Sequence, residues 1–345
     1  MILKEFKYDF LRYAKGFCFS ENYSIFCTGA RTFICDRQLN ILYTVEKLSY
    51  VYHAYISPDE ETLLLVSNSN IFYLVGLKDF SLKKYTIRDK YNDNLEGRGC
   101  WSFDGNSLLF DVNNRKTNNS ALRRYDLSCD MSYEDMLAEK YRLVSITPIK
   151  ELNKYLLIGQ DRQKPENDDT DRWSMIWFDG SSFEEYPIKH AEACLGVIVH
   201  AEYEHATNTV ILYGIRKTFR CDRQGRIIEE ISSPSMENGK ISFSSAVSLG
   251  PGAAKEVGDQ LTNLSALSET ESLQWGDRIN KICISSDGKK YYVGTHLGLY
   301  VVDAKTREPL KKEAIDYGVH DIAEISPGTI AVSTWTGVKV FETSD

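Results

Sequence analysis

Short apolar runs separated by polar turns recur along the whole chain. Ile56-Ser57-Pro58-Asp59 precedes Leu63-Leu64-Leu65-Val66, and Ile284-Ser285-Ser286-Asp287-Gly288 precedes Tyr291-Tyr292-Val293. Pro-Asp and Asp-Gly are turn dipeptides, and the flanking runs have the length and composition of strands. The pattern therefore predicts repeated strand–turn–strand units rather than helices.

One turn residue occupies the same place in each unit and marks the period of the repeat. These anchors are Ser20, Ser57, Ser102, Thr147, Tyr203, Ser285 and Ser326, and most gaps between them run from 37 to 56 residues. Third and fourth strands follow in the clearest unit, over Gly298–Asp303 and Pro309–Lys312. Four short antiparallel strands at this period are the signature of a β-propeller.

Two units match each other closely. Gly29–Gln38 aligns with Gly214–Gln224 around one inserted residue, Lys217, which indicates internal duplication. The repeat resembles that of the WD-repeat family of β-propellers over nearly the whole chain, in a degenerate form. His320, in Gly318-Val319-His320-Asp321, matches the family's Gly-His element, whereas Val302-Asp303 and Cys221-Asp222 stand where that family has Trp-Asp. The resemblance implies a rigid disc that docks other proteins.

The number of blades depends on one long gap. The interval from Tyr203 to Ser285 is 82 residues, and Ser233–Gly276 within it is rich in Ser, Gly, Glu and Asn. We interpret this stretch as an insertion between two blades; the alternative is an eighth, eroded blade that begins at Ile241-Ser242-Phe243. We therefore predict an all-β fold, a seven-bladed propeller of four-stranded antiparallel blades, as a single domain over residues 1–345.

Three insertions interrupt the predicted repeat, at about residues 128–140, 160–172 and 233–276. In the first, Met131–Lys140 is predicted to be a short helix, with Ser132 as N-cap and Asp135 three residues later. The second is a long polar hairpin loop that holds several carboxylates, which we expect to be solvated because their spacing does not fit a calcium loop.

The two ends of the chain suggest how the ring closes. The last unit supplies three strands, and Ile2–Phe6 is a lone strand pattern at the start. An open ring would expose sheet edges. We therefore predict that the N-terminal strand completes the final blade.

Composition and charge narrow the class of protein. Hydrophobic residues make up 42% of the 345, enough for a large core, and the net charge of −8 disfavours nucleic acid or an anionic membrane as partner. Charges at Lys4, Glu5 and Lys7 interrupt any signal-peptide pattern, and no long apolar run occurs. The eight cysteines contain no Cys-x-x-Cys pair, so we expect reduced thiols in a cytoplasmic protein.

A search for catalytic motifs finds none. Gly-x-Ser-x-Gly, the phosphate-loop motif and His-Glu-x-x-His do not occur. His53, His200 and His320 fall near the starts of predicted inner strands, where we expect them to make structural hydrogen bonds across a blade. The sequence therefore predicts no catalytic residue, no metal site and no cofactor, and it leaves enzyme activity open while favouring its absence.

Basic and aromatic residues concentrate in one class of loop. In a propeller, the loops that lead into the innermost strand and those that join the second and third strands lie on one face. The predicted partner- or anion-binding rim there comprises Arg31, Arg98, Arg142, Arg216, Arg278, His296, His320, Trp275, Trp335 and Tyr52. Arginine binds carboxylate and phosphate, and Arg, Trp and Tyr are enriched at interface centres. The competing interpretation is that each arginine pairs with a carboxylate of its own loop.

Two functions from different classes remain. The first is a non-catalytic scaffold or adaptor, a subunit of a larger assembly, that binds protein partners with an acidic surface. It would bind neither nucleic acid nor membrane, and its oligomeric state is open. The alternative is a small-ligand sensor or a lactonase-like propeller enzyme with an anionic ligand at the channel mouth, which rests on analogy of fold alone.

Overall fold

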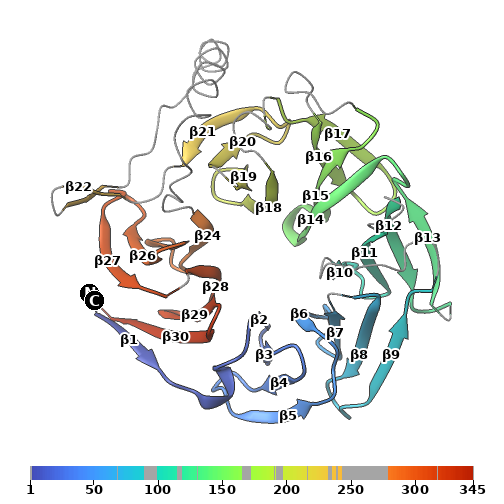
Figure 1. The fold of residues 1–345 in the computed structure, drawn as a ribbon, viewed down its shortest axis with the longest axis horizontal. Helices are drawn as coiled ribbons and strands as arrows, with labels where there is room; N and C mark the ends of the chain where they lie inside the picture. The colour runs from blue at the N-terminus through green and yellow to red at the C-terminus, as the bar shows by residue number, and fades with distance from the viewer. Residues whose placement is uncertain are drawn as a thin grey trace.

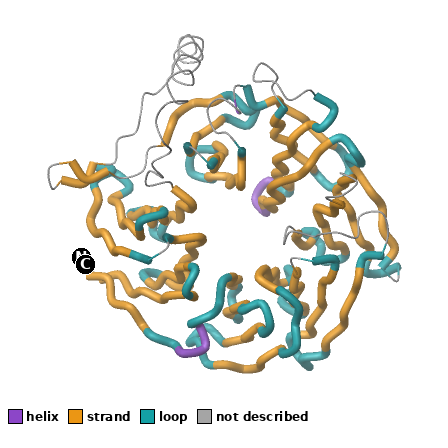
Figure 2. The backbone as a smooth tube through the Cα atoms, viewed as in Figure 1, coloured by secondary structure: helices purple, strands orange, loops and turns teal. Residues whose placement is uncertain are grey.

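The protein folds into seven four-stranded antiparallel sheets arranged in a ring (Figure 1). This computed structural model describes residues 2–67, 69–88, 99–114, 119–129, 131–164, 172–189, 191, 197–215, 217–231, 235–237, 240–242, 279–316 and 318–344. Strands dominate, and the tube drawing shows little helix (Figure 2). The predicted all-β, seven-bladed propeller is confirmed.

The first four blades follow one another in chain order. Blade 1 contains β2 (Gly16–Phe19), β3 (Ser24–Cys27), β4 (Thr32–Cys35) and β5 (Ile41–Val45). Blade 2 contains β6 (Val51–Ile56), β7 (Thr62–Ser67), β8 (Ile71–Gly76) and β9 (Leu82–Thr86). Blade 3 contains β10 (Gly99–Trp101), β11 (Ser107–Asn114), β12 (Asn119–Asp126) and β13 (Ser132–Met136). Blade 4 contains β14 (Tyr141–Ile149), β15 (Lys154–Asp161), β16 (Trp173–Phe178) and β17 (Phe183–Pro187).

The last three blades complete the ring. Blade 5 contains β18 (Ile198–Glu204), β19 (Thr209–Gly214), β20 (Thr218–Cys221) and β21 (Ile227–Ile231). Blade 6 contains β24 (Ile279–Ile284), β25 (Lys290–Thr295), β26 (Gly298–Asp303) and β27 (Pro309–Ala314). Blade 7 contains β28 (Val319–Ser326), β29 (Thr329–Thr334), β30 (Gly337–Ser344) and β1 (Ile2–Phe6). Two 3-10 helices, η1 (Asp9–Leu11) and η2 (Lys150–Leu152), lie in loops.

The N-terminal strand closes the ring, as predicted. β1 pairs antiparallel with β30, from Ile2 opposite Ser344 to Phe6 opposite Val340. A second contact between blades 7 and 1 lies closer to the axis. There the Ser333 hydroxyl donates a 2.6 Å hydrogen bond to the Lys15 carbonyl. The two chain ends therefore lie side by side at the edge of the disc (Figure 1).

The recurring turn is built by one local hydrogen-bond pattern. The Ser57 hydroxyl donates to Asp59 Oδ1 at 2.5 Å and accepts the Thr62 N–H at 2.9 Å. The same serine–aspartate pair recurs at Ser102 and Asp104 and at Ser285 and Asp287. The serine hydroxyl and nearby backbone N–H groups lower the pKa of Asp59, so the turn is held by an ionised carboxylate.

The duplicated segments occupy equivalent places. β4 and β20 are the third strands of blades 1 and 5, and each is followed by the same aspartate turn. Asp36 accepts hydrogen bonds from the backbone N–H groups two and four residues later, at 2.9 Å each, and Asp222 does the same. The sequence match therefore reflects repeated structure.

The core consists of apolar layers between neighbouring sheets. Leu156 and Trp177 of blade 4 pack in one cluster with Leu212 and Phe219 of blade 5, and all four are buried. Similar clusters join the other neighbouring blades. Each blade is thus stabilised by the next, and the ring behaves as one packed unit.

The predicted helix over Met131–Lys140 is wrong. Residues 132–136 form β13, the outer strand of blade 3. There Asp135 accepts hydrogen bonds of 2.7 and 2.9 Å from the buried Arg123 guanidinium of β12. Positive φ angles at Leu137 and Glu139 are incompatible with continuing a helix. The cross-strand ion pair and the need for a fourth strand override a local capping pattern.

The other two predicted insertions lie only partly within the described residues. The 160–172 segment joins β15 to β16, and its tip, residues 165–171, lies outside them. Of residues 233–276, only β22 (Ser235–Glu237) and β23 (Lys240–Ser242) are described, and these pair as a two-stranded sheet between blades 5 and 6. Ile241 and Ser242, the start of the alternative eighth blade, belong to this sheet; Phe243 lies outside the described residues.

The seven described cysteines form no disulfide bond with one another, and Cys194 lies outside the described residues. Burial raises the pKa of Cys18 to about 11 and that of Cys27 to about 12. These thiols are protonated at neutral pH and therefore unreactive. In the described ranges, no helix combines the length and apolar character needed to cross a bilayer.

We predict that titration of the denatured protein with a thiol reagent, without reductant, will count eight thiols. The reason is that the described cysteines make no disulfide and most are buried. A parallel titration after reduction serves as the control and should give the same count. A count of six or fewer before reduction would show that the protein carries a disulfide.

Candidate functional site

The strand order of each blade gives the disc two distinct faces. Strand direction alternates within every sheet, so the loops alternate between the two ends of the strands. One face is formed by the loops that lead into the first strand of each blade and by the loops that join the second strand to the third; we call it the upper face. The remaining loops form the lower face. The predicted rim belongs to the upper face.

The described rim residues all map to the upper face. Arg31, His296 and Trp335 lie in loops between second and third strands, and Tyr52, Arg142 and His320 are each the second residue of a first strand. Arg98, Arg216, Arg278 and Trp275 lie outside the described residues. The ring thus gathers residues on one face that are distant in the sequence.

Three of the predicted rim residues gather around one lysine. Lys15 Nζ lies 4.7 Å from the centre of the Trp335 ring and 5.9 Å from that of Tyr52. His320 packs edge-on against Trp335, with ring centres 5.3 Å apart. Trp335 nevertheless remains 59% exposed. We call these four residues the Trp335 cluster; they join blades 7, 1 and 2 at a surface that combines a cation with aromatic rings.

Arg31 makes a local ion pair. Its Nε lies 3.5 Å from Glu46 Oε1, in the next upper-face loop, and both side chains are more than half exposed. Such an exposed pair contributes little to stability and can exchange for another carboxylate.

In the described part of the loops, charge is distributed unequally between the two faces. Among the described residues, the upper-face loops carry twelve basic side chains: Lys7, Arg12, Lys15, Arg31, Lys47, Arg88, Lys140, Arg162, Lys164, Arg172, Lys189 and Lys217. Against them stand four acidic ones, Asp9, Glu46, Glu139 and Asp316. The acidic tip of the 162–172 loop lies outside the described residues. The described part of this face is therefore basic although the protein is acidic.

The lower face has the opposite balance. Its described loops hold twelve acidic side chains: Glu21, Asp36, Asp59, Glu60, Glu61, Asp79, Asp104, Glu151, Asp179, Asp222, Asp287 and Glu308. Its basic side chains are Arg37, Lys78, Lys150, Arg223, Arg226, Lys289, Lys305 and Arg307. The serine–aspartate turns of blades 2, 3 and 6 supply part of this acidity.

Exposed apolar side chains are also distributed unequally between the two faces. In the described loops, each large apolar residue that is more than a third exposed lies on the upper face. These residues are Tyr13, Tyr50, Val197, Ile215, Leu297 and Trp335. They come from loops of several blades, so they surround the axis instead of forming one local patch.

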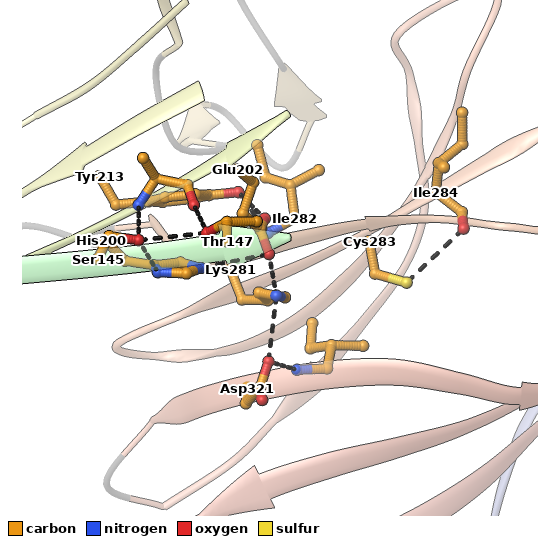
Figure 3. Close-up of polar contacts among 12 residues, drawn as sticks. Ser145, Thr147, His200, Glu202, Tyr213, Lys281, Ile282, Cys283, Ile284 and Asp321 are labelled. Atoms are coloured by element: carbon orange, nitrogen blue, oxygen red, sulfur yellow. Dashed lines mark hydrogen bonds and ion pairs between the residues drawn. The ribbon is translucent and has the colours of Figure 1, made fainter. Parts of the chain in front are cut away.

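A polar network links the first strands of blades 4 to 7 (Figure 3). His200 lies between Ser145, whose Oγ is 3.2 Å from its Nδ1, and Glu202, whose Oε1 is 3.5 Å from its Nε2. Glu202 also accepts a 2.7 Å hydrogen bond from the Tyr213 hydroxyl. On its other side it pairs with Lys281 of blade 6.

The network continues to blade 7 through Lys281. Its Nζ lies 3.4 Å from Asp321 Oδ1. Burial alone would raise the pKa of Glu202, but Lys281 and His200 outweigh it and hold that pKa well below its usual range. Burial likewise opposes the charge of Lys281, but Glu202 and Asp321 raise its pKa above the usual range. Both groups are therefore charged at neutral pH, and each charge is balanced.

His200 makes a side-chain hydrogen bond, but with Ser145 of the neighbouring blade and not across its own blade as predicted. Glu202 and Lys281 were not anticipated, because they are 79 residues apart and each stands in an ordinary strand. Among the described residues, no three His, Cys, Asp or Glu side chains gather as potential ligands of one metal ion. We assign the network to joining blades.

Comparison with protein-family models and with curated proteins finds no match. Solved structures match over the whole ring. The β-propeller domain of Cps50 (Swd1) from Myceliophteria thermophila aligns with a TM-score of 0.64 at 9% identity, covering 100% of both chains. The chain has a β-propeller fold. Hydrazine synthase from Kuenenia stuttgartiensis aligns with a TM-score of 0.60 at 10% identity, over 98% of this chain and 97% of that one. At such identities the propeller shares only its fold with these proteins.

Proposed function

We propose that this propeller is a non-catalytic scaffold or adaptor that docks an acidic protein partner on its upper face. The observation that carries the proposal is the difference between the two faces of the disc: within the described loops, exposed apolar side chains and an excess of basic over acidic side chains occur together on the upper face. Interfaces combine aromatic anchors with arginine, and opposite charge on the two partners speeds and orients association.

The Trp335 cluster is the proposed centre of that interface. An exposed tryptophan flanked by a lysine and a histidine can bury apolar area and offer charge to a carboxylate at the same time. The similarity to Swd1 is compatible with this function, but it supports only the fold and not a particular partner.

The test is co-purification with quantitative mass spectrometry, using the double charge reversal Arg12→Glu/Lys47→Glu and, separately, Trp335→Ala. Both cations are exposed on the upper face. We expect recovery of bound partner to fall about tenfold or more, because each reversed charge opposes an acidic surface. Binding to wild type should also weaken with salt, since the Debye length shrinks from about 10 Å at 0.1 M to about 3 Å at 1 M.

The matched control is Lys289→Glu/Lys305→Glu, which makes the same change of net charge at two exposed positions of the lower face. This variant should retain the partner. Equal loss in both double variants would point to net charge alone, and retention in the upper-face variants would overturn the proposed docking face.

A further inference from the structure

A pocket of about 400 Å³ lies between blades 4 and 5, which are neighbours in the ring (Figure 1). Trp177 of β16 and Tyr186 of β17 line it from blade 4, and Asn208 and the turn at 222–224 line it from blade 5. Those two blade 5 loops belong to the lower face, so the pocket is separate from the Trp335 cluster. Cavities of this size hold small molecules.

Arg223, in the β20–β21 turn, is held in this pocket by Trp177. Its carbonyl accepts a 2.9 Å hydrogen bond from Trp177 Nε1, and its guanidinium carbon lies 4.8 Å from the centre of the Trp177 ring. The tryptophan is 1% exposed, and Arg223 is partly buried above it. Within the described part of the chain, the guanidinium makes neither a hydrogen bond nor an ion pair. A fixed and partly desolvated cation is thus left with unused N–H donors.

The internal duplication provides a comparison for this arginine. Arg37 occupies the same place in the aspartate–arginine–glutamine turn of blade 1 as Arg223 does in blade 5. Arg37 donates a 3.0 Å hydrogen bond to the Ser20 carbonyl, in the first turn of its own blade. Arg223 contacts the neighbouring blade instead and makes no such bond. The aspartate builds both turns in the same way, so the turn itself does not require the N–H groups of Arg223.

The two carboxylates that line the pocket already have partners. Glu184 Oε1 pairs with Lys154 Nζ at 2.6 Å, and its Oε2 accepts a 3.5 Å hydrogen bond from the Tyr186 hydroxyl. Asp222 Oδ1 accepts two backbone N–H groups of its turn, and its Oδ2 accepts a 2.6 Å hydrogen bond from Arg226 Nε. Each carboxylate therefore has a cation of its own, and the positive charge of the pocket is not cancelled.

The other polar side chains of the pocket add donors. Asn208 Oδ1 accepts a 2.6 Å hydrogen bond from the Tyr203 hydroxyl, so its unused group is the side-chain NH₂. Gln224, next to Arg223, is exposed and carries a second amide. A guanidinium beside amide N–H groups matches the acceptor oxygens of an anion.

We propose that this pocket binds a small molecule through a carboxylate or phosphate group, which Arg223 holds with two parallel hydrogen bonds. The planar guanidinium suits both groups, because each presents two oxygens to the same fork. Stacking on Trp177 fixes the orientation of the fork before the ligand arrives, which reduces the entropy cost of binding. This site is independent of the proposed docking of a protein on the upper face.

Isothermal titration calorimetry of the full chain tests the site with two probes, sodium phosphate and sodium malonate, at constant ionic strength. We expect a dissociation constant on the order of 1 mM for the better probe, since each offers only the anionic group of a larger ligand. Tighter binding of phosphate would identify a phosphate-bearing ligand, and tighter binding of malonate a carboxylate-bearing one. Absence of binding by both probes up to about 20 mM would overturn the proposal.

Two substitutions in the pocket should weaken binding of the better probe about tenfold or more. Arg223→Met keeps an unbranched side chain over Trp177 but removes the guanidinium. Asn208→Asp has the same shape and still accepts the Tyr203 hydroxyl, but it replaces the N–H donors by a negative charge.

The matched control is Arg307→Met. Arg307 lies in the corresponding loop of blade 6, and its guanidinium carbon is 5.5 Å from the centre of the Tyr291 ring. The control makes the same change of net charge and loses the same kind of ring contact, so it should bind the probe like wild type. Circular dichroism should show all three variants folded. Equal weakening by Arg223→Met and Arg307→Met, or unchanged binding in Arg223→Met, would refute the assignment of the site to Arg223.

Discussion

Deletion of residues 1–8 should lower the melting temperature of the whole protein by roughly 10 °C, in a single transition. The deletion removes the five-residue ladder between β1 and β30. It also removes Leu3, Phe6 and Tyr8, which pack against apolar clusters of blades 6, 7 and 1. Partial burial of three such side chains stabilises by about 5 kcal/mol, and about 1 kcal/mol shifts the melting temperature by about 2 °C in a protein of this size.

Thermal unfolding followed by circular dichroism and by tryptophan fluorescence measures this effect. Because the blades stabilise one another in a closed ring, both signals should shift together. The control is Glu5→Gln, which removes only the partly exposed ion pair with Lys339 and keeps the strand. That variant should melt within about 1 °C of wild type. An unchanged melting temperature after the deletion would refute closure by β1.

The second large effect is expected at the ion pair between blades 5 and 6. Lys281→Met should destabilise the protein by about 2 to 4 kcal/mol, because Glu202 is left with its charge in a largely buried position. The side chains are 19% and 21% exposed, so the cost should fall somewhat below that of a fully buried pair. Urea denaturation at neutral pH measures the difference.

The chain offers a close control for this substitution. Lys289→Met removes a lysine from the same blade whose Nζ lies 3.5 Å from Asp287, but its side chain is 78% exposed. Its cost should stay within about 0.5 kcal/mol. The double variant Glu202→Gln/Lys281→Met should regain most of the stability, since no charge is then buried alone. Equal effects of the two lysine substitutions would show that the network contributes nothing.

The effect of Lys281→Met should depend on pH with a defined sign. The pKa of Glu202 is lower in the folded protein than in the unfolded chain, so its contribution is present above about pH 4.3 and is lost as pH falls through the folded pKa. The pKa of Lys281 is raised on folding, so its contribution is present below about pH 10.4 and is lost as pH rises through the folded pKa. The difference between wild type and variant should therefore be constant near neutrality and shrink in acid.

The sequence by itself determined the repeat of strands and turns, apart from the outer strand of blade 3, and the closure of the ring. The serine–aspartate turn at Ser57 is made by groups within five residues of one another, so it can be inferred from the sequence alone. The last unit supplies only three strands, and Ile2–Phe6 supplies one more. Because an open propeller would leave unpaired sheet edges, these two segments are expected to form one blade. These features depend on local backbone preference and on strand count.

Only the tertiary structure decided which distant residues meet. The outer strand at 132–136 was misassigned as a helix, because its partner Arg123 lies across a strand pair and not within helical reach. Lys281 pairs with Glu202 because blades 5 and 6 pack side by side, and Trp335 contacts Lys15 because the ring closes between blades 7 and 1. Hydrophobic periodicity reports which side of a strand is buried, but it carries no information about the neighbour across the interface, because any blade of matching shape would satisfy it.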